Sequence, residues 1–409
     1  MSVAERSSLA DEPPLAACTD RSRTAGVLYI VHDTSDAAVL RRVKMLEAGG
    51  GEVRLAGFRR SDACPDGVAD FGQTHAAKLI WRAMAVLRIC LQNRRHAPLA
   101  CRADAIICRN LESLVIGWLL RRSAGSRARL VYEVLDIHRA MLGRGFPSRM
   151  LRLLERRLAA SCSLVITSSP AFVQSYFDSI NPLGVPVRLV ENKVFPEAAA
   201  ARAGQSVRLP LPAGGEPIVI GWFGVIRCRK SLAILSELAR LMEGRLKVVI
   251  RGKVADHEFD DFAGTVERHP HLEYKGPYRN PDDLPLIYGD IDFSWAIDFF
   301  EEGQNSSWLL PNRLYEGCLY GAVPIALESV ETGRWLAARG IGLVLPSVEP
   351  ADIAGVLGHL DPSRRAELAA AVRRLPATTW SASASECRDI VGDVLGRPSL
   401  EPHPPTPDP

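Results

Sequence analysis

The chain has 409 residues, of which 47% are hydrophobic and 24% charged, and its formal net charge is +3. This length predicts two domains, and this composition is typical of a packed globular protein, so it excludes a disordered chain and a membrane helical bundle. Basic residues outnumber acidic ones by 28 to 19 in residues 1–200, whereas acidic residues predominate by 28 to 22 in residues 201–409. The basic half indicates a phosphate-bearing substrate, an acidic membrane surface, or only a solvated basic face.

Neither a secretion signal nor a membrane span is expected. The longest apolar run, from Ser113 to Leu120, is far shorter than the roughly 20 residues that cross a bilayer. Residues 1–24 are polar and lack an apolar core, so they do not resemble a signal peptide. Nine Cys are scattered without a CxxC pair, which predicts neither a disulfide framework nor a zinc site. We therefore expect a cytoplasmic protein.

In chain order, residues 1–24 are predicted to be a disordered tail and residues 25–195 a first domain. Its apolar runs GVLYIV, EVRLAGF, DAIICR, RLVYEV and SLVIT alternate with helical patterns over 37–47 and 76–91, from Leu111 and from Pro147. Short apolar strands separated by helices predict a parallel sheet that is covered on both faces.

A segment rich in Ala, Gly and Pro, residues 196–216, predicts an interdomain linker. The alternation then resumes over residues 217–397 with PIVIGWFG, LKVVIRG, LEYKG, IDFSWAI, VPIAL and GLVLP, and with helices from Ser231, Asn312 and Glu331. Residues 398–409 are predicted to be a second disordered tail. The fold class is therefore α/β, with two Rossmann-like domains that face each other across a cleft.

The first candidate site follows the first strand of the second domain, in the run GWFGVIRCRK. Gly224 permits close approach of a backbone, and the helix that follows offers unpaired N–H groups. Arg227 and Lys230 can neutralise a diphosphate. The run contains no GxGxxG fingerprint, and an ordinary turn with surface cations is the alternative interpretation.

The second candidate site is PNRLYEG, at residues 311–317. Pro311 can open a helix, which places Asn312 and Arg313 in the first turn and Glu316 one turn later. A carboxylate at this position can accept both hydroxyls of a ribose. A capped amphipathic helix with an exposed Glu is the alternative.

The run NRLYEGCLYGAVPIA, together with GxxRxxK and the two-domain plan, resembles GT-B glycosyltransferases, particularly family 4. The resemblance covers most of residues 26–395 and is specific in the C-terminal half. It implies that residues 217–397 bind a nucleotide-sugar donor and that residues 25–195 bind the acceptor. It assigns the donor diphosphate to Arg227 and Lys230, and the ribose to Glu316.

The sequence departs from that family at Trp308, where the first Glu of a paired-Glu motif is expected. The retaining mechanism and the sugar contacts of that Glu therefore do not carry over. Asn305, Ser306 and Glu302 are the alternatives for contacting the sugar.

The acceptor hydroxyl needs a general base, which an Asp or His at a strand end can supply. Similar transferases place such a residue in the acceptor domain, and the candidates are Asp33, Asp136 and His138. No metal site and no cofactor are expected, because cations and helix N-termini can neutralise the leaving diphosphate.

The stretch from Lys78 to Arg102 has Trp81, Met84, Leu87 and Leu91 near helical spacing among basic residues. Such a helix can lie on an anionic bilayer. A core helix with solvated Arg is the alternative.

The run DTSDAAVLRRVKML and the general layout resemble bacterial exopolysaccharide transferases of the succinoglycan type. This resemblance implies UDP-glucose as donor, a polyprenyl-diphosphate-linked glycan as acceptor, β-linkages and hence inversion, and peripheral contact with the inner face of the cytoplasmic membrane. No nucleic-acid partner is expected. A nucleotide-sugar epimerase of the same plan and a noncatalytic nucleotide-sugar-binding protein are the alternative functions.

Overall fold

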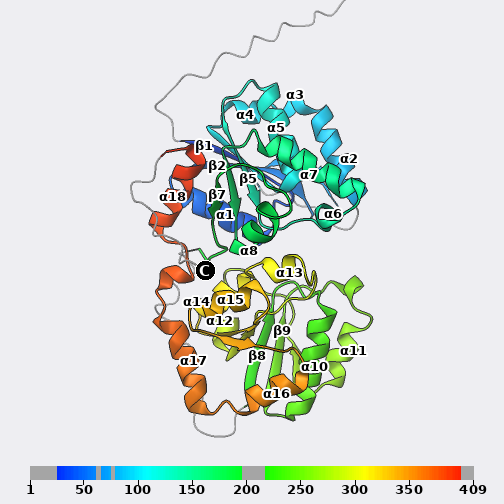
Figure 1. Ribbon diagram of the computed structural model, residues 1–409, viewed down its shortest axis with the longest axis vertical. Coiled ribbons are helices and arrows are strands. Elements are labelled where there is room, and N and C mark those ends of the chain that lie inside the picture. The colour runs from blue at the N-terminus through cyan, green and yellow to red at the C-terminus, as the bar shows by residue number, and fades with distance from the viewer. Residues whose placement is uncertain (1–24, 61–65, 75–78, 196–216, 398–409) are drawn as a thin grey trace, which may run out of the picture.

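The computed structural model shows two α/β domains, one above the other along the long axis of the molecule (Figure 1). It describes residues 25–60, 66–74, 79–195 and 217–397. The segments predicted as tails and linker, residues 1–24, 196–216 and 398–409, lie outside the described residues. The predicted fold class is confirmed, because each domain contains a parallel sheet covered by helices.

The first sheet has seven parallel strands in the order β3-β2-β1-β4-β5-β6-β7. The order reverses beside β1, as in doubly wound nucleotide-binding folds. The strands are β1 (Gly26–Val31), β2 (Glu52–Arg59), β3 (Ala69–Gln73), β4 (Ala105–Arg109), β5 (Arg129–Val134), β6 (Leu164–Thr167) and β7 (Val187–Leu189). The helices are α1 (Ala37–Ala48), α2 (Leu79–Leu91), α3 (Asn93–His96), α4 (Pro98–Cys101), α5 (Asn110–Ser123), α6 (Arg139–Leu142), α7 (Phe146–Ala159) and α8 (Pro170–Phe172), which a π-helical turn (Val173–Phe177) extends.

The second sheet has six parallel strands in the order β10-β9-β8-β11-β12-β13 and reverses beside β8. Its strands are β8 (Ile218–Phe223), β9 (Leu246–Arg251), β10 (Leu272–Tyr274), β11 (Phe293–Trp295), β12 (Val323–Leu327) and β13 (Leu343–Leu345). The helices are α10 (Arg229–Met242), α11 (Phe262–Arg268), α12 (Leu284–Gly289), α13 (Asn305–Trp308), α14 (Asn312–Leu319), α15 (Glu331–Ala337), α16 (Pro350–Gly358), α17 (Pro362–Arg374) and α18 (Ala384–Leu395). Single 3-10 turns occupy Asp256–Glu258 and Ala377–Thr379.

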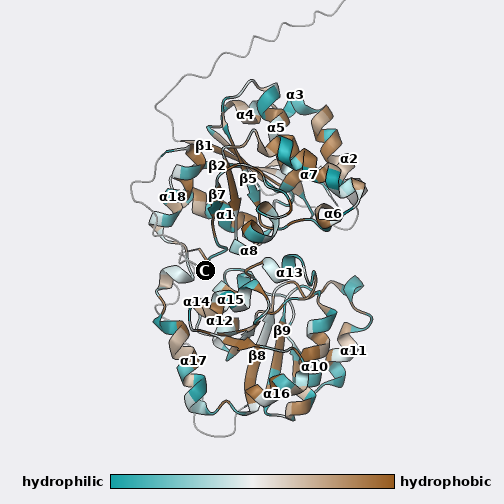
Figure 2. Cartoon of the chain, viewed as in Figure 1, coloured by the Kyte–Doolittle hydropathy of each residue, from teal (hydrophilic) through white to brown (hydrophobic). Residues whose placement is uncertain are grey.

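The central strands are buried on both faces. All six residues of β1 and all six of β8 are buried, which explains why these segments are continuous apolar runs rather than alternating patterns. Figure 2 shows central strands such as β8 as hydrophobic, while the helices carry both hydrophobic and hydrophilic residues. Burial of each large side chain contributes about 1.5–3 kcal/mol to the driving force for folding.

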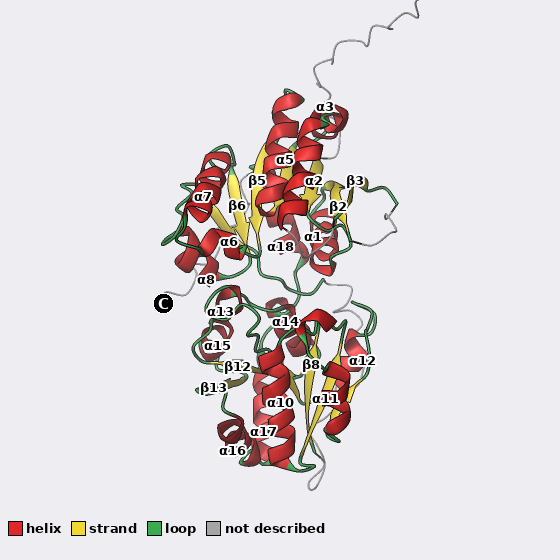
Figure 3. Ribbon diagram, turned by 90° about the vertical axis from the view of Figure 1, so that its right-hand side faces the viewer, coloured by secondary structure: helices red, strands yellow, loops and turns green. Residues whose placement is uncertain are grey.

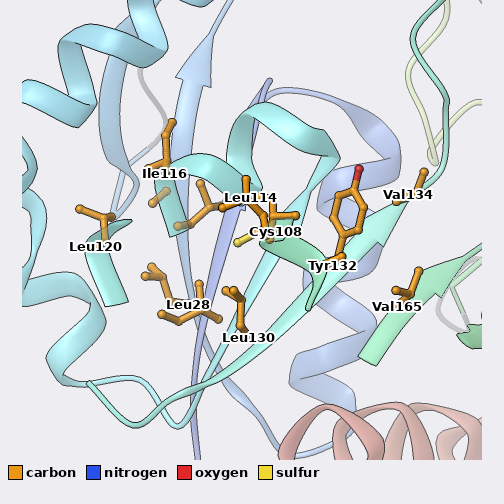
Figure 4. Packing of buried hydrophobic residues seen from close by; sticks show 14 of the residues in the cluster. Leu28, Cys108, Leu114, Ile116, Leu120, Leu130, Tyr132, Val134 and Val165 are labelled. Carbon is orange, nitrogen blue, oxygen red and sulfur yellow. The ribbon is translucent and has the colours of Figure 1, made fainter. Parts of the chain in front are cut away.

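Helices pack on both faces of each sheet. In the first domain α5 covers one face and α1 covers the other. Figure 3 shows α2, α5 and α7 side by side on the face that α5 covers. On this face Leu114 and Leu120 of α5 pack with Leu28, Leu130 and Tyr132 of neighbouring strands (Figure 4).

Helix α18 packs on the first sheet although it is the last element described. It shares a core with α1, formed by Val39, Met45, Leu46, Cys387, Ile390, Val391 and Val394. Just before it, the chain returns to the first domain: the N–H of Val194 donates to the carbonyl of Trp380, and the N–H of Ala382 donates to the carbonyl of Val194. The range 217–397 that the sequence assigns to the second domain thus ends in a helix that covers the first sheet (Figure 1).

One strand and the start of one helix differ from the sequence pattern in ways that affect the site. Strand β3 was not expected, because Asp70 and Gly72 interrupt its apolar residues, and Asp136 therefore follows the fifth strand instead of the fourth. Helix α10 begins two residues earlier than expected, so that Lys230 lies in its first turn.

The loops at the carboxyl ends of the two sheets meet between the domains. The side chain of Asn305 in α13 bonds to the backbone of Ile137, which follows β5. The Ser169 hydroxyl, before α8, donates to the carbonyl of Trp308, and Figure 3 shows α8 and α13 on either side of the boundary. Open α/β sheets bind their ligands at this edge, so the candidate site lies here.

Candidate active site

The loop after β8 exposes its backbone at Gly224. The φ angle of Gly224 is +120°, which side chains other than hydrogen rarely permit. A Cβ added there would meet no atom within 4 Å, so a ligand can approach this backbone closely. The loop then leads into α10, where the Cys228 sulfur accepts the N–H of Ser231. The remaining N–H groups of that first turn can bind an anion.

Arg227 and Lys230 are exposed and lie over aromatic rings. The guanidinium carbon of Arg227 is 4.2 Å from the ring centroid of Phe300, and Nζ of Lys230 is 4.3 Å from that of Phe299. Lys230 also bonds both carboxylate oxygens of Glu302, at 2.7 and 3.0 Å. An exposed ion pair contributes only about 0–1 kcal/mol, so a diphosphate can replace Glu302 as the partner of Lys230.

Helix α14 carries the three remaining donor-site candidates in its first two turns. Arg313 donates to the carbonyl of Ile297 at 3.0 Å, which fixes its side chain beside the loop after β11. The Oδ1 atom of Asn312 accepts a bond of 3.4 Å from Arg41. Glu316, one turn later, is buried.

Among the described residues, three side chains donate hydrogen bonds to the Glu316 carboxylate. Oε1 accepts from Nη2 of Arg41 at 2.9 Å and from Nδ2 of Asn280 at 3.0 Å, and Oε2 accepts from the Tyr288 hydroxyl at 3.2 Å. Burial and the charge of Glu316 raise the pKa of Tyr288 well above its usual range, so the phenol remains a donor. A carboxylate has about four acceptor positions, so one position is left for a ligand hydroxyl.

Asp136 lies at the carboxyl end of β5 and is accessible to solvent. The surrounding protein nevertheless removes part of its hydration, and this desolvation raises the pKa of Asp136 to about 6. The charge of Glu301 adds to the increase, whereas the charge of Arg227 opposes it. A carboxylate of the first domain and a cation of the second are therefore within electrostatic range of each other. A pKa close to the working pH suits a general base.

The other two candidates for the base have structural partners. The Nδ1 atom of His138 accepts the backbone N–H two residues further along the chain, at 3.1 Å. This bond caps the N-terminus of α6. Desolvation and the charge of Arg82 lower the pKa of His138. Asp33 is buried, bonds the N–H and the hydroxyl of Ser35, and pairs with Arg60 at 3.1 Å. The roles of both residues as base stay predictions, and the geometry favours Asp136.

Trp308 is a contact between the domains. Its ring packs against the core of the first domain, and its carbonyl accepts the Ser169 hydroxyl. Two of the alternatives for contacting the sugar are buried: Asn305 is bonded to the first domain, and the Ser306 hydroxyl accepts the N–H of Glu301. Glu302 remains the exposed alternative.

One loop, residues 297–302, contacts three of the predicted donor-site residues. Its contacts in chain order are the Ile297 carbonyl with Arg313, the Phe299 ring with Lys230, and the Phe300 ring with Arg227. The charge of Glu301 in the same loop contributes to the raised pKa of Asp136. Sequence reasoning named Glu302 of this loop but missed its contacts with Arg313, Lys230 and Arg227, as it missed Arg41, Asn280 and Tyr288 around Glu316. None of these residues has a local sequence signal, because their partners lie in other elements.

No group of three or more His, Cys, Asp or Glu side chains that could hold a metal ion occurs in the described ranges. The expectation that the reaction needs no metal stays a prediction. The exposed cations Arg227 and Lys230 have the chemistry to neutralise a diphosphate in place of a metal.

Comparison with known proteins identifies the family. The succinoglycan biosynthesis protein ExoL of Rhizobium meliloti (strain 1021) is 45% identical over 370 residues, which cover 89% of this chain and 92% of ExoL. The chain belongs to the ExoL family. The predicted resemblance to exopolysaccharide biosynthesis proteins of the succinoglycan type is therefore confirmed. No family model matches the chain.

Solved structures share the fold of this ExoL-family chain. HepE of Anabaena, solved with UDP and glucose, has a TM-score of 0.65 at 15% identity, covering 90% of this chain and 99% of HepE. Sucrose-phosphate synthase of Thermosynechococcus elongatus has a TM-score of 0.65 at 14% identity, covering 85% and 93%. A glycosyltransferase of Rickettsia africae ESF-5 has a TM-score of 0.59 at 12% identity, covering 91% and 99%. The chain thus has the predicted GT-B fold.

Proposed function

We propose that the chain transfers a hexosyl group, in particular glucose, from a UDP-sugar to a lipid-diphosphate-linked oligosaccharide during exopolysaccharide synthesis. The observation that carries the proposal is the pair of hydrogen bonds from the Asn305 side chain to the backbone of Ile137. These bonds hold the segment of the candidate base Asp136 against the segment that follows β11, whose Phe300 ring lies under the candidate phosphate ligand Arg227. The succinoglycan role named for ExoL and the UDP-glucose bound in HepE support the same substrates.

The second domain supplies the donor site in this proposal. The diphosphate approaches the backbone at Gly224 and is neutralised by Arg227 and Lys230, which aromatic rings hold in place. The ribose bonds to Glu316. Asn312 and Arg313 lie on the first turn of α14, one turn before Glu316.

The first domain supplies the base. As the acceptor oxygen forms its bond to the anomeric carbon, the bond from that carbon to the diphosphate oxygen breaks. The acceptor proton passes to the Asp136 carboxylate, and UDP leaves with its new charge next to Arg227 and Lys230. A base on the acceptor side belongs to a single displacement, which inverts the anomeric configuration.

Transfer of labelled glucose from UDP-glucose to lipid-linked oligosaccharides tests the proposal. We expect label in the lipid fraction with UDP-glucose and little with GDP- or ADP-linked sugars, and we expect an inverted linkage in the NMR spectrum of the product. UDP-glucose incubated alone provides the control. Its conversion to an epimer would identify an epimerase instead, and tight binding without transfer to any lipid-linked acceptor would identify a noncatalytic protein.

A surface on the first domain supports a lipid-linked acceptor. Large apolar side chains are exposed on α2 and α7, namely Met84, Leu87, Leu91, Phe146, Met150, Leu153 and Leu154. Both helices lie on the same face of the domain (Figure 3). The sequence of α2 has no acidic residue, and the one acidic residue of α7, Glu155, is buried against Tyr132 and Tyr176. Exposed arginines on α7, such as Arg149 and Arg157, make the face cationic.

We name this α2–α7 face the apolar-basic face, and we propose that it rests on an anionic bilayer. Membrane contact was predicted from the stretch Lys78 to Arg102. The structure does not describe the side chains of several of its residues, among them Lys78 and Trp81. No helix within the described ranges is long and apolar enough to cross a bilayer. The face therefore provides peripheral contact, with α7 beginning a few residues after Asp136 and His138.

Sedimentation with vesicles tests this contact. We expect the protein to bind vesicles that contain phosphatidylglycerol and not vesicles of phosphatidylcholine alone. Phe146→Asp with Met150→Asp should abolish binding, whereas Leu286→Asp, at a 65% exposed position of α12 in the second domain, should not. Equal binding by the Phe146→Asp, Met150→Asp variant would exclude the apolar-basic face as the contact.

A further inference from the structure

Arg41 of α1 reaches across the domain boundary to Glu316. Its Nη2 atom donates to Glu316 at 2.9 Å, and its Nη1 atom donates to the carbonyl of Asn192 at 3.0 Å and to Oδ1 of Asn312 at 3.4 Å. The side chains of Arg41 and Glu316 are only 8% and 3% exposed. The guanidinium is thus fixed by three acceptors in a water-poor environment.

Arg41 is the one cation among the three side chains that donate to Glu316, since Asn280 and Tyr288 are neutral. A buried carboxylate without a cationic partner either takes up a proton or turns toward water, because the uncompensated charge is costly to desolvate. The orientation of the Glu316 carboxylate therefore depends on Arg41.

We infer that Arg41 is a positioning residue for nucleotide binding, acting from the first domain on the ribose-binding carboxylate of the second. This inference rests on the proposed function. Arg41 and Asn280 occupy one oxygen of Glu316, and Tyr288 occupies part of the other. The acceptor position that remains open is thereby directed to a single ligand hydroxyl. The nucleotide site is complete only when the first domain is in place.

A double-mutant cycle on calorimetric UDP affinity tests the inference. We expect Arg41→Met and Glu316→Gln each to weaken UDP binding about tenfold, equivalent to about 1.4 kcal/mol. Because Arg41 acts through Glu316, the double variant should bind UDP no more weakly than Glu316→Gln alone. Arg41→Met should change the affinity for either 2′-deoxy-UDP or 3′-deoxy-UDP much less than the affinity for UDP, since one of these ligands lacks the hydroxyl that Glu316 accepts.

Two further variants keep the test informative if Arg41→Met folds poorly. Arg41→Lys keeps the charge but loses the planar fork, and it should recover part of the affinity. Arg59→Met is a matched control, because Arg59 is ion-paired with Asp70 at 3.0 Å in the same domain; its UDP affinity should equal that of the wild type. Thermal unfolding of each variant confirms that it is folded at the assay temperature.

The possible failures are distinguishable. Arg41 does not act through Glu316 if Arg41→Met weakens UDP binding equally in the wild type and in the Glu316→Gln variant, or if it tightens UDP binding. Either result would overturn the role of Arg41 and leave the proposed transferase intact. Unchanged UDP affinity in Glu316→Gln would reject the ribose site itself.

Discussion

The side chain of Asn305 hydrogen-bonds both backbone groups of Ile137. Its Oδ1 atom accepts the N–H at 3.0 Å, and its Nδ2 atom donates to the carbonyl at 2.8 Å. Asn305 belongs to the second domain, whereas Ile137 lies in the first, between Asp136 and His138. The segment that carries the candidate base is therefore held in place by the opposite domain.

Replacing Asn305 with Ala should lower kcat while leaving UDP affinity nearly unchanged. The substitution leaves two backbone groups of Ile137 unpaired, at a cost of about 1–3 kcal/mol each if they stay buried, so we expect the Asp136 segment to shift. Steady-state kinetics together with calorimetry separate the two effects. Ser307→Ala is the control, because it removes a hydroxyl that accepts the N–H of Gly303 in the same loop. Wild-type kcat in Asn305→Ala would contradict this role.

Asp136→Asn should reduce kcat by a factor of about 10²–10⁴, the range typical of a lost general base. The wild-type kcat/KM should fall as the pH drops below about 6, because desolvation raises the pKa of Asp136 to about 6 and only the ionised carboxylate accepts a proton. The variant should lack this acidic limb. A pH profile of both proteins checks the assignment. If Asp136→Asn keeps the acidic limb of the kcat/KM profile, the general base is another group. His138→Asn tests the nearest alternative.

Arg227→Ala and Lys230→Ala should each weaken UDP binding by about 1.5–3 kcal/mol, the usual contribution of a hydrogen bond to a charged group. Uridine should bind almost as before, since it has no phosphate. Calorimetry at two salt concentrations should also show a smaller salt dependence for both variants. Arg229→Ala is the matched control, because Arg229 lies between them in sequence but pairs with Asp260 at 2.9 Å. An effect of Arg229→Ala as large as that of its neighbours would indicate only general charge attraction.

Glu133→Gln should destabilise the first domain by about 3–5 kcal/mol, because it leaves two buried cations without a counter-charge. Glu133 is buried and bonds Arg42 at 2.8 Å, Arg109 at 2.9 Å and the Tyr29 hydroxyl. The free energy of unfolding, measured with denaturant, should be compared with that of Glu237→Gln. Glu237 forms an exposed ion pair with Arg240, so its loss should cost little. Little loss in Glu133→Gln would show that the network is not required for stability.

The pH dependence of this contribution has a definite sign. Burial raises the pKa of Glu133, but the charges of Arg109 and Arg42 outweigh it and lower the pKa to about 2. The stabilisation is therefore complete above the ordinary value of 4.5 and is lost as the pH falls from there through about 2. The difference between wild type and Glu133→Gln should be the same at pH 7 and pH 5. A difference that shrinks by pH 5 would contradict the lowered pKa.

Much of the fold could be predicted because strand burial leaves a local signal. Strands β1 and β8 are buried on both faces, so each is a continuous apolar run. Strand β3 lies at the edge of its sheet and contains Asp70 and Gly72, so it gave no such signal. Helix α18 resembles any amphipathic helix, and no local pattern states which sheet its apolar face covers.

The candidate site divides in the same way. The amino-acid sequence by itself determined the candidate donor segments, which contain Gly224, Arg227, Lys230 and Glu316. It could do so because the chemistry of turns and helix starts depends on neighbours in the sequence. The tertiary structure alone decided that Arg41 pairs with Glu316 and that Asn305 holds Ile137. The physical reason is that these bonds join residues far apart in the chain, so their geometry exists only after two sheets have packed and brought their carboxyl ends together.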